Sequence, residues 1–190
     1  MNTKYEFTGE TKIVYGHTLR RIKAIVAIGA TVAPGDIGGW IESENNLSAS
    51  DDAWVYGDAW VSGNAWVSGN ARVSGDAEVS GDAWVSGDAW VYGNARVFGN
   101  ALVSGDAEVS GDKIEKENDL INITSNAGSY NITITPNHIK IGCQYHSKKA
   151  WFKFTDNEIV KMDDEKAVVW WKTWKPILQA ICDSLKGKEE

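Results

Sequence analysis

The segment from Asp51 to Asp112 decides the fold, because it repeats one hexad, Gly-Asp/Asn-Ala-x-Val-x, about ten times. Gly57-Asp58-Ala59-Trp60-Val61-Ser62 is one copy, and the phase holds without insertion to Gly105-Asp106-Ala107-Glu108-Val109-Ser110. Alternate residues of a strand face opposite sides, so Ala and Val of each hexad point one way and the variable residue between them points the other. Gly followed by Asp or Asn suits a turn, because Gly adopts positive φ freely and Asp and Asn tolerate it.

Each hexad is therefore predicted to be one short strand followed by one corner. A single hexad cannot bury its Val alone, so neighbouring hexads must stack on one another. We predict a mainly β fold, a parallel β-helix whose interior is filled by Val and Ala.

The hexads resemble the repeat of left-handed parallel β-helix proteins, in which three hexads, 18 residues, form one triangular coil. A second resemblance covers roughly residues 4–112 and is carried by 19–25, 38–44, 46–48 and 53–56, with Gly38-Gly39-Trp40-Ile41-Glu42 as its most specific part. These segments are similar to those of phage- and prophage-type hexapeptide-repeat proteins. That family implies a left-handed β-helix and no settled activity.

In coils of 18 residues, positions i and i+18 stack, and the variable residues sort into three outward faces. Face one carries a stacked outward ladder of Trp54, Arg72 and Trp90, and Glu108 follows at its end. Face two carries Trp60, Glu78 and Arg96. Face three is an uninterrupted apolar ladder of Trp66, Trp84 and Leu102. A contiguous apolar strip indicates a contact surface, and self-association is the contact we expect. The alternative is that Trp stacks on Trp only to stiffen the sheet.

The repeat is strongly acidic. The chain has a formal net charge of −7, and residues 45–112 alone hold ten Asp or Glu against two Arg. Direct nucleic-acid binding needs basic patches, so we expect none, although an acidic shaft leaves mimicry of a nucleic acid open. Stacked corner carboxylates such as Asp58 over Asp76 can hold a hard cation. Because Asp and Asn interchange at this position, turn geometry explains them, and we predict no metal site.

We divide the chain into an N-terminal strand cap (1–30), the parallel β-helix (31–112), a linker (113–118) and a small α+β domain (119–190). The cap is predicted to contain a short hairpin or two strands around Gly9 and a strand over residues 18–28, which shield the unpaired edge of the first coil. The linker is placed where Lys113 and the residues after it break the six-residue period.

The last domain should contain a β-hairpin about Pro136-Asn137 and a helix that starts at the capping box Thr155-Asp156-Asn157-Glu158. From Ala167 onward, apolar residues recur at spacings of four and three, which predicts a helical stripe that includes Trp174. We interpret this stripe as core packing or as a partner site. Trp170 lies off the stripe and is the better candidate for an exposed contact, so Trp170 and Trp174 join the predicted interaction face.

Little in the sequence indicates catalysis. Acyltransferases of this fold usually resemble one another in having a catalytic His in the coil region, since imidazole titrates near working pH. Here His17, His138 and His146 all lie outside the regular coils. We predict a protein that is not an enzyme, with no catalytic residue and no cofactor, and keep an acyltransferase as an unfavoured alternative.

The basic residues form few clusters. Candidate anion contacts are Arg20, Arg21, Lys23, Lys148 and Lys149, and the alternative is that these residues are solvated strand edges. The first six residues contain no apolar run, which predicts no signal peptide and no membrane span. We therefore expect a cytoplasmic location, in the host cell if the protein is phage-encoded, and no membrane contact.

These observations favour a non-catalytic structural or protein-interaction module, phage-derived and homo-oligomeric, with a trimer favoured by the resemblance. A second hypothesis is a phage inhibitor of a host defence factor. It would act by binding a host protein, by acidic mimicry of nucleic acid, or by sequestering a small nucleotide between subunits.

Overall fold

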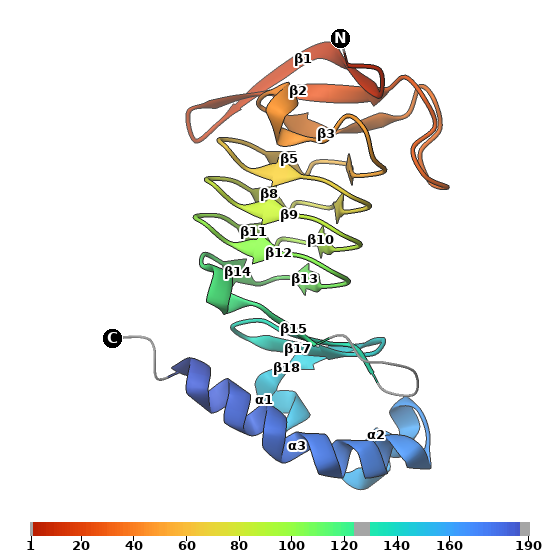
Figure 1. The fold of residues 1–190 in the computed structure, drawn as a ribbon, viewed down its shortest axis with the longest axis vertical. Coiled ribbons are helices and arrows are strands. Elements are labelled where there is room, and N and C mark those ends of the chain that lie inside the picture. Colours follow the sequence, from red (N-terminus) through yellow and green to blue (C-terminus); the bar gives the residue numbers. More distant parts are fainter. Residues whose placement is uncertain (1, 124–129, 187–190) are drawn as a thin grey trace.

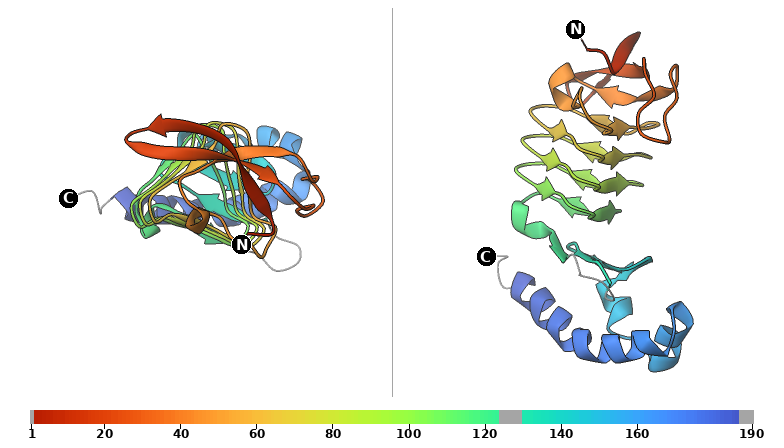
Figure 2. Two further views of the ribbon diagram at one scale, coloured as in Figure 1. Left: turned by 90° about the horizontal axis from the view of Figure 1, so that it is seen from above. Right: turned by 45° about the vertical axis from the view of Figure 1, so that its right-hand side comes forward.

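The computed structural model describes residues 2–123 and 130–186, and its centre is a β-solenoid of about four turns (Figure 1). The solenoid stands between N-terminal strands at one end and a small sheet with helices at the other. Residues 124–129 and 187–190 of the predicted last domain lie outside the described residues. Seen from above, successive coils lie over one another (Figure 2).

Three parallel sheets form the sides of the solenoid. Face one consists of β4 (Trp54–Val55), β7 (Arg72–Val73), β10 (Trp90–Tyr92) and β13 (Glu108–Ser110). Face two consists of β5 (Trp60–Val61), β8 (Glu78–Val79), β11 (Arg96–Val97) and β14 (Lys113–Ile114). Face three consists of β6 (Trp66–Val67), β9 (Trp84–Val85) and β12 (Leu102–Val103).

The register stacks like positions on like positions. Trp66 pairs with Trp84, and Leu102 pairs with Trp84 from the other side. The Ala and Val of the hexads are almost completely buried, and they form one continuous cluster along the axis. The mainly β, solenoidal prediction is confirmed in this coarse form.

The N-terminal strands extend face two beyond the first coil. β1 (Tyr5–Val14) pairs antiparallel with β2 (His17–Ala24), β2 pairs with β3 (Ile37–Ile41), and β3 pairs parallel with β5. A short 3-10 helix, Glu44–Asn46, follows. The prediction of separate strands around Gly9 is wrong, because β1 is one strand that absorbs Gly9 at a register shift. The chain reverses instead at Tyr15 and Gly16, both with positive φ.

The residues predicted to form a linker partly continue the solenoid. Lys113 pairs with Arg96 and Ile114 pairs with Val97, so β14 adds one more strand to face two. A 3-10 helix, Glu117–Asp119, then leads away from the coil. The side chain of Ile114 is completely buried in the solenoid core, and this burial explains why the strand forms although the hexad pattern has ended.

The C-terminal part is a four-stranded antiparallel sheet with helices packed on it. The strands are β15 (Ile121–Ile123), β16 (Ile132–Ile134), β17 (His138–Ile141) and β18 (Gln144–Ser147). The helices are α1 (Lys148–Trp151), α2 (Asp156–Met162) and α3 (Glu165–Lys186). As the sequence predicts, the hairpin turns at residues 135–137, and α2 begins at the Thr155 capping box.

The sheet of this last part contacts the open end of the solenoid. The hydroxyl of Tyr145 donates to the carbonyl of Ser110, and the Asn122 amide donates to the Asp106 carboxylate at 2.7 Å. Lys140 forms an ion pair with Glu108. An unpaired strand edge must be covered or satisfied in some other way. Polar side chains of the C-terminal sheet therefore provide hydrogen-bond and ion-pair partners for part of the last coil.

Candidate functional site

Face three carries the predicted apolar ladder on its outward side. The indoles of Trp66 and Trp84 are stacked, with centroids 5.4 Å apart and planes 19° apart. They are 42% and 47% exposed, and Leu102 continues the column with intermediate exposure. The Trp84 Nε1 donates to the Ser68 hydroxyl at 3.3 Å, which holds this indole in place. We call Trp66, Trp84 and Leu102 the ladder from here on.

The outward column of face one is only partly a surface. Trp54, Arg72 and Trp90 pair in register as predicted, but Trp54 is 1% exposed. The ring of Tyr5 meets its indole edge-on at 6.2 Å, so the N-terminal cap covers it. Trp54 is therefore a core residue, which corrects its placement in an exposed ladder. Trp90 is 39% exposed, and its Nε1 donates to Ser74 at 2.9 Å.

Face two carries a groove that the sequence did not indicate. Its volume is about 340 Å³, within the range of ligand-sized pockets. Aromatic residues Tyr15, Trp60 and Phe98 contribute to its lining, together with Arg96 and Lys113. The remaining lining residues are His17, Glu78, Ser80 and Val97. We call this set of nine residues the groove.

The turn between β1 and β2 closes one end of the groove. Tyr15 is 75% exposed, has a φ of 48° and lies 6.2 Å from the Trp60 ring. A non-glycine residue in this left-handed region pays a conformational cost of roughly 1–2 kcal/mol. Tyr15 and Gly16 are the two loop residues between the paired Val14 and His17, and a two-residue hairpin turn favours positive φ at both positions.

Charges inside the groove are partly paired. Arg96 Nε donates to Glu78 at 2.8 Å, whereas the Lys113 ammonium lies over the Phe98 ring at 4.8 Å. Lys113 forms an ion pair with Glu115 at 3.8 Å, and the lysine side chain is 63% exposed. The groove therefore combines aromatic surface with one paired arginine and one largely exposed lysine.

The corner carboxylates form amide–carboxylate contacts between coils. Asn64 Nδ2 donates to Asp82 at 2.9 Å, and Asn70 Nδ2 donates to Asp88 at 2.8 Å. Within the described residues, no three His, Cys, Asp or Glu side chains gather as they would around a metal ion. The mixture of Asp and Asn at corners thus has a structural use, because an amide stacked on a carboxylate avoids like-charge contact.

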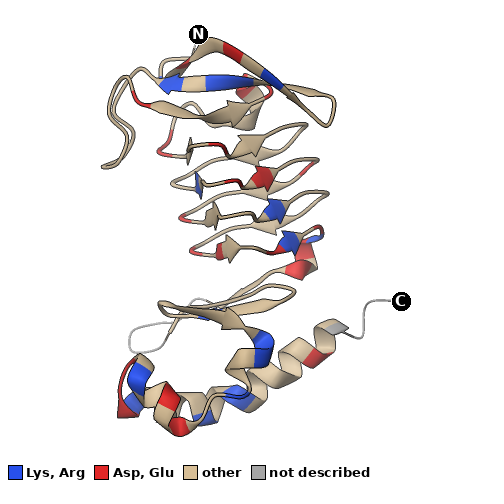
Figure 3. Cartoon of the chain, turned by 180° about the vertical axis from the view of Figure 1, so that it is seen from behind, with Lys and Arg blue, Asp and Glu red and all other residues tan. Residues whose placement is uncertain are grey.

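The five candidate anion contacts do not form one site. Arg20 donates to the Glu42 carbonyl at 2.8 Å and lies over Phe7, and Lys23 pairs with Glu6 at 2.8 Å. Arg21 lies over the Trp40 ring at 4.9 Å, and its guanidinium is 3.7 Å from Asp58. These three residues lie on β2, whereas Lys148 and Lys149 lie on α1 at the other end of the molecule (Figure 3). The structure therefore separates the predicted basic residues into two groups.

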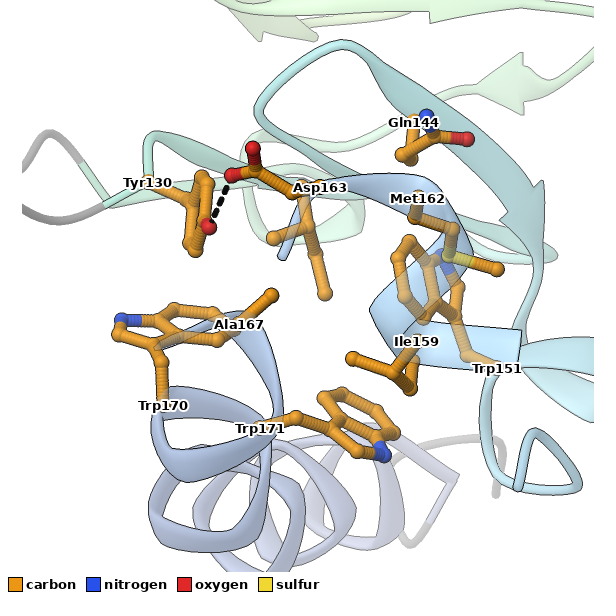
Figure 4. A pocket seen from close by; sticks show the side chains of 10 residues that line it. Tyr130, Gln144, Trp151, Ile159, Met162, Asp163, Ala167, Trp170 and Trp171 are labelled. Carbon is orange, nitrogen blue, oxygen red and sulfur yellow. Dashed lines mark hydrogen bonds between the residues drawn. The ribbon is translucent and has the colours of Figure 1, made fainter. Parts of the chain in front are cut away.

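Trp170 and Trp174 belong to the C-terminal part and not to the ladder. They stack on each other at 5.4 Å and pack against its hydrophobic core, so Trp170 is half-buried, contrary to the prediction of an exposed contact. Trp170 lines an apolar crevice with Trp151 and Trp171, toward which Ile159 also points (Figure 4). The crevice measures about 40 Å³, well below the volume of ligand pockets.

Tyr130 closes one side of that crevice by donating to the Asp163 carboxylate (Figure 4). This hydrogen bond and, to a smaller extent, burial raise the pKa of Tyr130 to about 12. The group is therefore protonated at neutral pH and acts as a structural donor. The crevice is therefore a small apolar surface feature of the C-terminal part, below the size of a ligand pocket.

Two comparisons with known proteins bear on this chain. Residues 89–105 and 95–111 match a family model described as the YdcK beta solenoid repeat. The two matches are offset by six residues, the length of one hexad, and lie in the later coils. No curated protein matches the chain. Of the helices within residues 2–123 and 130–186, none combines the length and apolar character needed to cross a bilayer.

Proposed function

We propose that this protein is a non-catalytic interaction module that associates with copies of itself through the ladder. The observation that carries the proposal is the stacked pair of half-exposed indoles, Trp66 and Trp84, continued by Leu102. A contiguous exposed apolar strip of this kind is typical of a protein contact. Burying this strip in an assembly would remove indole surface from water and stabilise the assembly by about 25 cal/mol per Å² of apolar surface buried.

The proposal includes finer features that the resemblance implies. These are a left-handed winding with three hexads per coil, a trimeric assembly and a phage origin. It also includes the cytoplasmic location expected from the first residues of the sequence. The i to i+18 pairing, such as Trp66 with Trp84, supports the coil of three hexads. The acidic surface of the solenoid supports a protein partner over a nucleic acid, because nucleic-acid binding needs a basic footprint.

The test is the molar mass in solution, measured by light scattering after size exclusion over a wide concentration range. We expect the natural chain to have a multiple of the monomer mass of 20.8 kDa. The double variant Trp66→Ser/Trp84→Ser should approach the monomer mass. Trp90→Ser is the matched control, because Trp90 has similar exposure on a different face, and this variant should assemble like the natural chain.

Circular dichroism of all three proteins would show that the solenoid is intact. A natural chain that stays monomeric at every concentration would contradict the proposal. So would a Trp66→Ser/Trp84→Ser variant with unchanged mass.

A further inference from the structure

The ladder and the groove lie at the same height along the solenoid axis. Trp60 of the groove and Trp66 of the ladder belong to consecutive strands, β5 and β6. The next coil contributes Glu78 to the groove and Trp84 to the ladder, and the coil after that contributes Arg96 and Leu102. One aromatic surface thus projects from face three while a groove with aromatic lining is level with it on face two.

The two surfaces also complement each other in shape and charge. The stacked, half-exposed indoles of the ladder lie on the outward side of face three, whereas the groove is a concavity lined in part by Tyr15 of the hairpin turn. Asp82 lies in the corner just before Trp84 and is exposed, and the groove presents the exposed Lys113 ammonium. Opposite charges across an interface favour one register and suppress others.

The strained turn fits the same arrangement. Ile13 and Tyr15 are the most exposed large hydrophobic residues of the described chain, at 76% and 75%, and both lie at the tip of the β1–β2 hairpin. Seen from above, this tip reaches past the side of the coils (Figure 2). An apolar hairpin tip beside a groove enlarges the surface that a neighbouring molecule can cover.

We propose that the ladder of one protomer docks into the groove of the next, so that the assembly is head-to-tail. The inference rests on the proposed function and names the receiving surface. A heterologous contact of this kind closes into a ring when the rotation permits and otherwise forms a filament. Rotation about an axis parallel to the solenoid preserves height, and the level positions of ladder and groove therefore favour a closed ring.

The test uses two variants that each lose one half of the contact. The ladder variant is Trp66→Ser/Trp84→Ser, and the groove variant is Tyr15→Asn/Phe98→Ser. Asn tolerates the positive φ of position 15, so the turn is preserved. Phe98 lies outside the hydrophobic core clusters, so the solenoid keeps its interior. Trp90→Ser serves again as the control, and circular dichroism verifies the fold of each protein.

We expect each variant alone to be monomeric. A mixture of equal amounts should form a dimer of one ladder variant and one groove variant, because the groove variant supplies the ladder and the ladder variant supplies the groove. The dimer cannot grow, since its two outer surfaces are both disabled. Light scattering measures the mass, and labelling the two variants with different fluorophores detects the mixed pair by energy transfer.

The outcomes separate the two proposals. A groove variant that assembles like the natural chain overturns the head-to-tail contact and leaves self-association through the ladder standing. A mixture that stays monomeric, while the natural chain assembles, also overturns the head-to-tail contact. A natural chain that is monomeric removes the proposed function itself, and the inference with it.

Discussion

The buried carboxylate of Asp112 accepts a hydrogen bond from Nδ1 of His138 at 2.7 Å. Its side chain is completely buried, and it also accepts from the backbone and side chain of Asn137, from Thr135 and from Tyr145. Burial, and then the charge of Asp112, raise the pKa of the Tyr145 hydroxyl, which keeps this donor protonated. One carboxylate in the last coil therefore fastens the C-terminal hairpin to the solenoid.

Replacing Asp112 by Asn should weaken that junction. An amide offers one acceptor oxygen where the carboxylate offers two, so some of the converging donors lose their partner. Each buried unsatisfied group costs about 1–3 kcal/mol. We expect the free energy of unfolding to fall by about 2–4 kcal/mol, measured by urea unfolding followed by Trp fluorescence. Asp76→Asn, at the same hexad position on an exposed corner, should change it by less than about 0.5 kcal/mol.

Replacement by alanine should destabilise the protein more at a corner glycine than at Gly9 of β1. A Cβ at Gly87 would lie 2.8 Å from the carbonyl oxygen of Gly105 in the next coil, at a φ of +70°. At Gly9, with a φ of +93°, a Cβ meets nothing within 4 Å. Gly9→Ala should cost only the conformational strain, roughly 1–2 kcal/mol. Gly87→Ala should cost about 1–3 kcal/mol more through overpacking. Equal unfolding midpoints would show that the coils can separate without penalty.

Glu42 should make the free energy of unfolding depend on pH in the acidic range. The backbone N–H of Gly63 donates to its carboxylate at 2.7 Å, and this bond, with a smaller effect of His17, lowers the pKa of Glu42 below the ordinary 4.5. Because the pKa of Glu42 is lower in the folded state than in the unfolded state, its carboxylate stabilises the fold at pH values above the unfolded-state pKa. This stability is lost as the pH falls through the folded-state pKa.

The variant Glu42→Gln should therefore lower the free energy of unfolding at pH 7 by about 1 kcal/mol. It should also flatten the fall in stability below pH 4.5, since the titrating group is gone. Urea unfolding at a series of pH values measures both effects. Glu10→Gln, an exposed position on β1, is the control and should leave the profile unchanged.

Trp54 and Trp90 occupy the same column of face one but should respond differently to truncation. Trp54 is buried beneath Tyr5, so Trp54→Ala should lower the free energy of unfolding by about 3–5 kcal/mol. Trp90→Ala removes a half-exposed indole and one hydrogen bond, and we expect a loss of about 1 kcal/mol. Similar losses from both variants would show that the N-terminal cap does not stabilise the first coil.

The repeat allowed much of the architecture to be predicted. Alternation within Ala-x-Val fixes which side chains turn inward, and the stacking of Trp66 on Trp84 follows from that periodicity. The helix beginning after Thr155 could also be predicted, because capping is a local interaction between residues close in sequence.

Features that depend on contacts between segments distant in sequence could not be predicted from the periodicity. Periodicity assigns Trp54 an outward direction, but it cannot reveal that Tyr5 covers it. Asp112 occupies the same hexad position as the exposed Asp76, and only its place in the last coil makes it a buried junction residue. The groove depends on the hairpin turning at Tyr15, whereas the sequence drew attention to Gly9.

The register that pairs Trp66 with Trp84, and Trp84 with Leu102, makes each coil interchangeable with its neighbours. Duplicating residues 76–93 would lengthen the shaft by roughly 4.8 Å, the spacing between paired strands. The Tyr5 cover at one end and the Asp112 fastening at the other would keep their own partners. The distance between the two ends is thus encoded in whole coils, so that evolution or an engineer can change the reach of the molecule without redesigning either terminus.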